Sequence, residues 1–594
     1  MKGRLKKTLA LTLSGAMMIG SLTMLTGCGS SGSSSSADAT SFSFLLNGDD
    51  GKSFYTGNAQ NPAAIYWKNM EWDADGDGET VKLDIEITEL PTGTESDTMN
   101  TIMATGEYGD LIDLGYVSDS AATLYGNGII LDLTDLVDQY MPNYKAWMES
   151  HPDYADRLYT NVDGEDKIIS LYQVNDVSPD EWCGYEYRRD WIVKYGTNPE
   201  TGESFTGGWE GDEYVDDVVF PSGETYPKTI TDWEWMFEIF DRAIDEQGID
   251  GGYAFALCSA GMIELGDLVS GFGMGSPMYS IQDGECVFGA DTDQFRTYIE
   301  CMNTWYENGW IKKDFDEEVG TMFWSVDNEN VYSGKVGCWY GMNSSLGNKL
   351  DTNDGNEVLE GIAVFAAPTP INDKYGDESC RNKTPNTMFT NSHMVGEAYA
   401  ITEKAADKDL ASLLTAIDYL YSEEGGRLIS CGLSEEQADS DEEIRAIYDK
   451  MGLTGGAYTI EEYDGEEWLV NVPEYKGNQD VENACRFMRM TGLGIHDNRD
   501  EGDGTFLSSQ YKVWSTYDKT GNIGSEITSQ LTQDQADETS LNTTNIRTYN
   551  NSAIPDFITG RTDIYDDAAW QAYCDEVNAY NPQVYCEYIN AIIK

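Results

Sequence analysis

Aromatic residues are the first candidates for chemistry in this sequence. The segment CWYG at 338–341 places Trp339 and Tyr340 side by side, and Trp191 and Trp324 lie in two further aromatic segments. The apolar C–H face of a sugar ring packs on such rings, while planar polar groups bind its hydroxyls. We therefore predict these four residues as ligand contacts, with packing in the protein core as the alternative for each.

Two charged residues complete the predicted ligand set. Asp110 follows a glycine in a Gly-Asp turn, and Arg189 stands in the segment RRDW at 188–191. Carboxylate and guanidinium groups are planar and can hold hydroxyl groups. A turn-capping carboxylate and a hinge salt bridge are the respective alternatives.

The segment DADGDGETVKLD at 73–84 has the spacing of a calcium loop. Alternate carboxylates at positions 1, 3 and 5 of such a twelve-residue loop converge on a hard cation, and glycine at position 6 permits the turn. The candidate ligands are Asp73, Asp75, Asp77, Glu79 and Asp84. Because position 12 is an aspartate inside a predicted strand, an acidic Gly-rich turn is the leading interpretation, and a structural calcium ion is the alternative. No other cofactor is predicted.

No catalytic centre is marked in the sequence. The chain has 105 acidic residues, so close carboxylate pairs carry little information, and its 3 histidines lie far apart. Neither GxSxG nor HExxH occurs. Of the 11 cysteines, ten are scattered without a CxxC pair; we expect most to be buried small hydrophobes, with one or two disulfides possible.

The N-terminus has the pattern of an export signal. Four basic residues precede a mostly apolar stretch from Thr8 to Leu25, which is too interrupted by Ser, Thr and Gly for a membrane span. The next residues, LTGC, resemble the lipobox of bacterial lipoproteins, in which the cysteine is lipidated and becomes the new N-terminus. Residues 1–27 are then a signal peptide, Cys28 an anchor, and 28–40 a Ser/Gly tether.

The charge and the apolar content of the chain limit which binding partners and folds we expect. Removal of the signal changes the formal charge from −68 to about −72, which disfavours nucleic acid, polyphosphate and anionic lipid headgroups. With 40% apolar and 12% aromatic residues the body must fold, and its length requires two or more lobes.

Predicted strands and helices alternate along the first part of the chain. We predict strands at 41–46 and 81–87, a helix around 99–103 ending near Gly106, and a strand at 110–116, the rhythm of a parallel sheet covered by helices. A helix in the segment TITDWEWMFEIFDRAI (229–244) has a predicted capping box of Thr231 and Glu234. A further helix over 410–421 is predicted to end at Gly425, and 201–223 is predicted as a surface excursion.

Eight segments in order resemble the family 1 extracellular solute-binding proteins of ABC importers, in particular their large lipoprotein branch in Gram-positive bacteria. The usual proline before the aspartate of the first segment is Gly109 here, and about thirty residues are inserted after YEYRRDWIVKYG. The segments are TMNTIMATGEYGDLIDL (98–114), GNGIILDLTDLVDQYMPNY (126–144), YEYRRDWIVKYG (185–196), YPKTITDWEWMFEIF (226–240), WYENGWIKKDF (305–315), YSGKVGCWYG (332–341), AIDYLYSEEGGRLISCGL (416–433) and IPDFITGRTDI (554–564).

The resemblance implies an α/β, two-lobed periplasmic-binding-protein-like fold with hinge strands and an interlobe cleft that closes over its ligand. It also implies that Trp339 and Tyr340 follow a strand that runs into this cleft. We place the first part of the N-terminal lobe at 41–180 and that of the C-terminal lobe at 181–395. A returning segment at 396–450 lies mainly on the N-terminal lobe, and the helical part at 451–594 mainly on the C-terminal lobe.

The expected function is that of a monomeric, non-enzymatic lipoprotein, anchored through Cys28 on the outer face of the cytoplasmic membrane. It would capture an oligosaccharide and deliver it to ABC permease subunits. Another small solute such as a peptide is the first alternative, and an exported glycoside hydrolase the second.

Overall fold

The computed structural model describes most of the chain after the predicted tether. The described residues are 39–48, 53–91, 94–162, 164–176, 183–211, 213–257, 267–317, 328–342, 345–348, 361–385, 394–463, 466–472, 479–487, 489–495, 509–510, 513–514, 521, 523–528 and 530–593. Among them, no helix is both long and apolar enough to cross a membrane.

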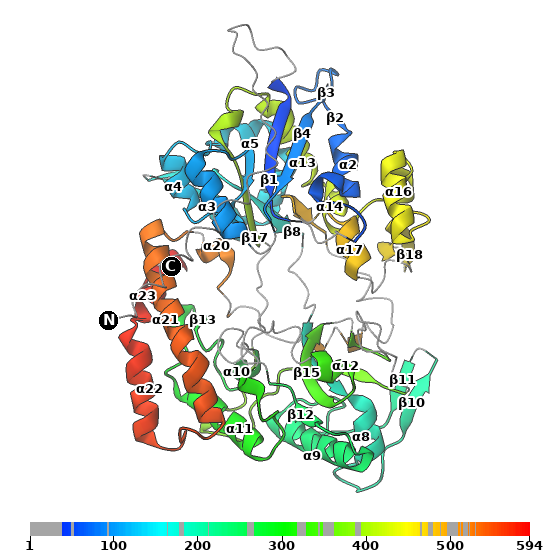
Figure 1. Cartoon of the computed structure of the whole chain (residues 1–594), viewed down its shortest axis with the longest axis vertical. Coiled ribbons are helices and arrows are strands. Elements are labelled where there is room, and N and C mark those ends of the chain that lie inside the picture. Colours follow the sequence, from blue (N-terminus) through cyan, green and yellow to red (C-terminus); the bar gives the residue numbers. More distant parts are fainter. Residues whose placement is uncertain are drawn as a thin grey trace, which may run out of the picture. The chain divides into compact units, whose positions relative to one another are not determined.

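The first lobe is built on a six-stranded sheet with the strand order β20-β8-β17-β5-β1-β4 (Figure 1). Strand β1 pairs in parallel with β4 and β5, whereas β17 is antiparallel to β5 and β8. The strands are β1 (Ser41–Leu46), β4 (Asp84–Glu89), β5 (Leu111–Asp113), β8 (Leu171–Asn175), β17 (Met394–Ile401) and β20 (Leu493–Gly494). The predicted strand–helix–strand order at the start of the chain is confirmed, because α3 (Glu95–Thr105) connects β4 to β5 and ends at Gly106 in the left-handed conformation.

Two apolar clusters cover this sheet. The larger one buries Trp67, Tyr144 and Tyr399, and the smaller one buries Met99 and Ile112. The remaining helices of the lobe are α2 (Pro62–Lys68), α4 (Ala121–Gly126), α5 (Thr134–Tyr140), α6 (Pro142–Ser150), α7 (Pro152–Ala155), α13 (Leu410–Tyr419), α14 (Glu423–Ser430), α15 (Glu435–Ala438), α16 (Glu442–Met451) and α17 (Gln479–Cys485). Its short hairpins are β2 (Glu71–Trp72) with β3 (Val81–Lys82), β6 (Thr160–Val162) with β7 (Glu165–Lys167), and β18 (Tyr458–Tyr463) with β19 (Glu466–Asn471).

The returning segment of the first lobe extends beyond the predicted range of 396–450. Several side chains on both sides of position 450, among them Tyr448, Leu453 and Met490, are buried in the larger first-lobe cluster, and β20 completes the sheet. The boundary expected at 450 is therefore too early, because the apolar side chains beyond it find their packing partners on the first lobe.

The second lobe contains a four-stranded sheet with the order β12-β15-β9-β16. Strand β9 is antiparallel to both neighbours, and β12 is parallel to β15. The strands are β9 (Cys183–Arg188), β12 (Tyr253–Phe255), β15 (Val336–Met342) and β16 (Val364–Ala367). One face carries a large cluster that includes Trp191, Trp233 and Trp305, and the other a small cluster around Trp339 and Trp514.

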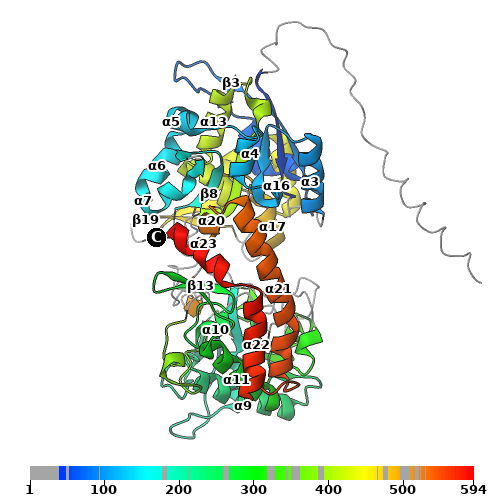
Figure 2. The same cartoon turned by 90° about the vertical axis from the view of Figure 1, so that its left-hand side faces the viewer.

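Helices from two distant parts of the chain pack on the second lobe. The central ones are α8 (Arg189–Tyr195), α9 (Ile230–Gln247), α10 (Asp267–Ser270), α11 (Asp293–Glu307) and α12 (Asn328–Tyr332), and the C-terminal ones are α20 (Ser525–Thr528), α21 (Gln533–Ile558), α22 (Asp567–Ala579) and α23 (Gln583–Ile593). Ile546, Phe557 and Cys586 of the C-terminal helices are buried in the large cluster. Figure 2 shows α21 and α22 side by side.

Two predicted helix signals are wrong. The capping box of α9 joins Thr229 and Asp232, two residues earlier than predicted, because the helix begins at Ile230. Gly425 does not end a helix but lies within α14, where a Cβ atom would be 1.9 Å from the carbonyl oxygen of Tyr419. Close backbone approach, rather than a turn, therefore explains this glycine.

The Gly-rich insertion forms a hairpin of β10 (Gly207–Glu210) and β11 (Glu213–Asp216). Its ends are exposed, as predicted, but two of its side chains contact the lobe. The indole of Trp209 donates to the carbonyl of Ile362 at 2.9 Å, and Asp216 pairs with Arg189. The insertion is thus attached to the second sheet by side chains as well as by the chain itself.

Candidate ligand-binding site

The two residues of the aromatic pair lie on opposite faces of β15. Tyr340 belongs to the large cluster, where its ring lies 5.0 Å from that of Tyr185 in an edge-on arrangement. Trp339 belongs to the small cluster and is 2% exposed. Strand geometry separates neighbouring side chains in this way, so the pair does not form one aromatic platform.

Trp339 lies opposite Glu186 of β9, and both have unused hydrogen-bonding atoms. The two residues are in register across the antiparallel strands. Glu186 is 0% exposed, and neither of its carboxyl oxygens has a hydrogen-bond partner in the structure. The same holds for Nε1 of Trp339. Buried polar groups are nearly always paired, so this cluster is exceptional.

Gly341 lies directly beside Trp339 and Glu186. A Cβ atom at position 341 would lie 2.7 Å from Nε1 of Trp339 and 3.0 Å from Oε2 of Glu186. Two unpaired polar atoms, Nε1 of Trp339 and Oε2 of Glu186, therefore lie beside a position where only glycine leaves room. An indole N–H and a carboxyl group are suitable partners for a hydroxyl group.

The environment of Glu186 disfavours its charged form. Burial raises the pKa of its carboxyl well above the usual range, while the nearby indole N–H of Trp339 opposes this without reaching hydrogen-bond geometry. We did not predict Glu186 from the sequence. The available signal was a single acidic residue between two tyrosines in the apolar strand CGYEYR.

Asp110 has a structural role in the first lobe. Its Oδ2 accepts from the backbone N–H of Ser43 at 2.7 Å and lies 2.8 Å from Nζ of Lys408, and the residue is 1% exposed. The preceding Gly109 lies so close to β1 that a Cβ would be 2.5 Å from the carbonyl oxygen of Ser43. These contacts join β1 to the turn before β5, and the ligand role of Asp110 stays a prediction.

Arg189 and Trp191 are also packed inside the second lobe. The guanidinium of Arg189 forms a two-pronged pair with Asp216 at 2.9 and 2.6 Å and donates to the carbonyl of Thr225. Trp191 is 2% exposed and packs edge-on against Phe240. Their ligand role stays a prediction that the observed packing does not favour. Trp324 lies outside the described residues, as does Cys28.

The loop at 73–84 is exposed and bonded to itself. The Asp73 carboxylate accepts from the backbone N–H groups of Asp77 and Gly78 at 3.2 and 2.9 Å. Gly76 and Gly78 have left-handed backbone angles, and Asp84 begins β4. Among the described residues, no three or more His, Cys, Asp or Glu side chains are placed to hold a metal ion. The Asp73 carboxylate thus caps the backbone of this loop, and a calcium site at 73–84 stays a prediction.

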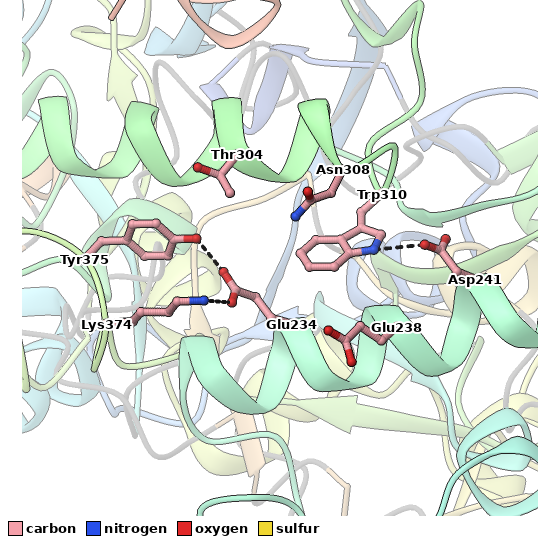
Figure 3. Close-up of a pocket in the computed structure, with 8 residues that line it drawn as sticks. All are labelled: Glu234, Glu238, Asp241, Thr304, Asn308, Trp310, Lys374 and Tyr375. Atoms are coloured by element: carbon pink, nitrogen blue, oxygen red, sulfur yellow. Dashed lines mark hydrogen bonds and ion pairs between the residues drawn. The ribbon is translucent and has the colours of Figure 1, made fainter. Parts of the chain in front are cut away.

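A polar cavity of about 400 Å³ lies between α9 and α11 on the second lobe (Figure 3). Sequence reasoning did not predict it. It is lined by Glu234, Glu238, Asp241, Thr304, Asn308, Trp310, Lys374 and Tyr375. Figure 3 shows the Glu234 carboxylate directed at Lys374 and Tyr375, and the Trp310 indole directed at Asp241.

Two of the three carboxylates that line this cavity, Glu234 and Asp241, have structural partners. Glu234 accepts from the indole of Trp305 at 3.0 Å and from the hydroxyl of Tyr375 at 2.6 Å, and it forms an ion pair with Lys374. Burial raises the pKa of Asp241 to about 6, although the hydrogen bond from Trp310 opposes the shift. These contacts fasten α9 to α11 and to the 372–375 turn, and they arrange no acid–base pair around a free space.

The sequence is similar to that of a curated ABC transporter protein. The chain is 22% identical over 373 residues to the fructooligosaccharide ABC transporter substrate-binding protein FusA of Streptococcus pneumoniae, which corresponds to 60% of this chain and 61% of that protein. The chain thus matches about three fifths of the length of this relative. No family model matches the sequence.

The fold is that of two-lobed solute-binding proteins. An HMO-binding, ABC-transporter-associated solute-binding protein from Bifidobacterium longum infantis superposes with a TM-score of 0.63 at 14% identity, covering 93% of this chain and 98% of that one. An EF-hand mutant of S. pneumoniae FusA in complex with fructo-nystose gives 0.61 at 15% identity, with the same coverage. The predicted fold class is confirmed, and the chain is similar to carbohydrate-binding proteins of ABC transporters.

Proposed function

We propose that this protein captures an oligosaccharide outside the cell and delivers it to an ABC permease. The observation that carries the proposal is the agreement of two comparisons: the curated relative and the solved structures that cover 93% of the chain are carbohydrate-binding proteins of ABC transporters. The strongly acidic chain, with formal charge −68, is suited to a neutral ligand and repels an anionic one.

Within this function, Trp339 and Glu186 are the residues that we assign to the sugar. Binding proteins of this class act by hinge movement, so a group that is buried in one state can reach the ligand in another. The indole N–H would donate to a sugar oxygen, and the neutral carboxyl group could both donate and accept. Unpaired buried polar atoms cost free energy in the empty protein, and a ligand hydroxyl would offset that cost.

Transport rather than catalysis is the activity that the relatives support, since they are binding proteins and not enzymes. An intact ligand must be released to the permease. Two mass-spectrometric measurements on a bound oligosaccharide, before and after incubation, distinguish transport from the hydrolase alternative.

Calorimetry of the purified protein against a panel of neutral oligosaccharides tests the proposal. We expect at least one ligand to bind without chemical change, and Trp339→Ala to weaken that binding by about 2 kcal/mol or more. Tyr340→Phe is the matched control, because its ring faces the opposite side of the sheet. Absence of binding across the panel, or equal loss in both variants, would contradict it.

Membrane anchoring is a separate part of the proposal. The lipobox-like LTGC supports lipidation at Cys28, which would keep the receptor near its permease. Metabolic labelling with a fatty-acid analogue, compared between the natural chain and Cys28→Ser, tests it.

Calcium at 73–84 also stays a prediction; one solved neighbour is an EF-hand mutant of FusA.

A further inference from the structure

Two cysteines that are 300 positions apart in the sequence meet in the second lobe. Sγ of Cys286 lies 3.1 Å from Sγ of Cys586. Cys286 belongs to β14 (Glu285–Phe288), which pairs with β13 (Tyr279–Gln282), and Cys586 belongs to the last helix, α23. The separation is shorter than an ordinary contact between two sulfur atoms, and it exceeds the bond length of about 2.05 Å by roughly one ångström.

The surroundings of the pair hold both backbones in place. The amide N–H of Cys286 donates to the side-chain oxygen of Asn590, one turn after Cys586, at 2.9 Å. The rings of Tyr279 and Tyr585 lie 4.3 Å apart beside it. Both thiols are buried, with exposed fractions of 6% and 4%. Strand and helix are thus aligned by contacts that do not depend on the sulfur atoms.

Other described cysteines have different neighbours. Cys380 lies 3.5 Å from the hydroxyl of Thr297, and Cys485 lies 3.7 Å from the sulfur of Met451. Both thiols are buried, and each contacts a side chain other than a cysteine.

We propose that Cys286 and Cys586 form a disulfide that fastens the C-terminal helix α23 to the β13–β14 hairpin in the exported protein. This inference rests on the proposed extracellular location, where disulfides persist. It selects one pair among the cysteines that the sequence leaves open.

The chemistry is thiol–disulfide exchange with an external disulfide as the oxidant. The Cys586 thiolate attacks one sulfur of the oxidant, and the first oxidant thiolate leaves. The Cys286 thiolate then attacks Sγ of Cys586, the new S–S bond forms, and the second oxidant thiolate leaves. Both cysteines are oxidised, the oxidant is reduced to two thiols, and these take up the two cysteine protons. The hydrogen bond from Cys286 lowers the pKa of Cys586, which favours Cys586 as the first nucleophile.

Such a bond would constrain the unfolded chain over a very long loop. Cross-linking distant residues reduces the conformational entropy of the unfolded state, and the effect grows with loop length. Because α23 contacts both α21 and α20, its attachment would also hold the C-terminal helices on the second lobe.

Peptide mapping of the full chain tests the proposal. The protein is incubated with oxidised glutathione while it refolds, its free thiols are alkylated in denaturant, and it is digested without reductant. We expect a cross-linked peptide containing Cys286 and Cys586, and an intact mass two hydrogen atoms lower before alkylation. Full alkylation of both cysteines after this treatment, or a bond from either to another cysteine, overturns the proposal.

Matched variants connect the bond to stability. The melting temperature of the oxidised natural chain should fall when a reductant is added, whereas that of the Cys286→Ala, Cys586→Ala double variant should not respond. Cys574→Ala, in the neighbouring helix α22, is the control and should keep the reductant response. An equal response in the double variant would contradict the assignment. Oligosaccharide binding, measured in parallel, reports on the proposed function independently.

Discussion

Replacement of Glu186 by glutamine should change how the stability of the second lobe depends on pH. Glu186 is fully buried without a hydrogen-bond partner, and burial raises the pKa of its carboxyl well above the ordinary value. The folded protein therefore holds this proton at pH values where the unfolded chain has lost it. Glutamine has nearly the same shape and never ionises.

The sign and size follow from proton linkage. A raised pKa in the folded state gives a contribution to stability that is fully present below the unfolded pKa, near about 4.3, and is lost as pH rises toward the folded pKa. The natural chain should lose about 1.4 kcal/mol of unfolding free energy per pH unit from this one group. Between the unfolded pKa and the raised folded pKa, Glu186→Gln should therefore gain stability relative to the natural chain as pH rises, by about 1.4 kcal/mol per pH unit.

Urea unfolding followed by tryptophan fluorescence at several pH values measures this difference. Comparison with the natural chain cancels the other titrating groups, and Glu210→Gln on exposed β10 is the matched control, for which we expect no change of slope. A free-energy difference between Glu186→Gln and the natural chain that stays constant from about pH 5.5 to about pH 7.5 would refute the reasoning. It would mean that this carboxyl has the same charge in the folded and unfolded chain.

Three further changes test other contacts. Arg189→Ala should lower the free energy of unfolding in urea by about 3–5 kcal/mol, because it removes the ion-pair partner of the buried Asp216 side chain. Arg561→Ala, which removes a more exposed ion pair, should lower it by less than about 1 kcal/mol. Equal losses in the two variants would contradict the structural role of Arg189. Gly109→Ala should lower the melting temperature, since its Cβ would lie 2.5 Å from the carbonyl oxygen of Ser43; an unchanged value would show that the backbone yields freely. If the 73–84 loop binds calcium, added Ca²⁺ should raise the melting temperature of the natural chain and not that of Asp73→Ala, and no response in either would leave the acidic turn as the correct reading.

The local patterns of the sequence predicted the framework of the first lobe. Alternating apolar residues specify β1, and the left-handed Gly106 ends α3 where expected. The amphipathic stripe of α9 also lies in the core, as its spacing predicts. These features depend on neighbours a few residues away, so the sequence contains them directly. The ordered segments that resemble the solute-binding family supplied the two-lobed fold.

Only the tertiary structure decided which polar side chains have partners and which keep polar atoms without a hydrogen bond. Nothing near Arg189 in the sequence announces Asp216 of the inserted hairpin as its partner. Likewise, the unpaired carboxyl of Glu186 becomes visible only when β9 lies against β15 and Gly341. The meeting of Cys286 with Cys586 depends on docking of the last helix. Pairing across hundreds of residues is set by how the packed elements bury their apolar faces, and local spacing contains no record of it.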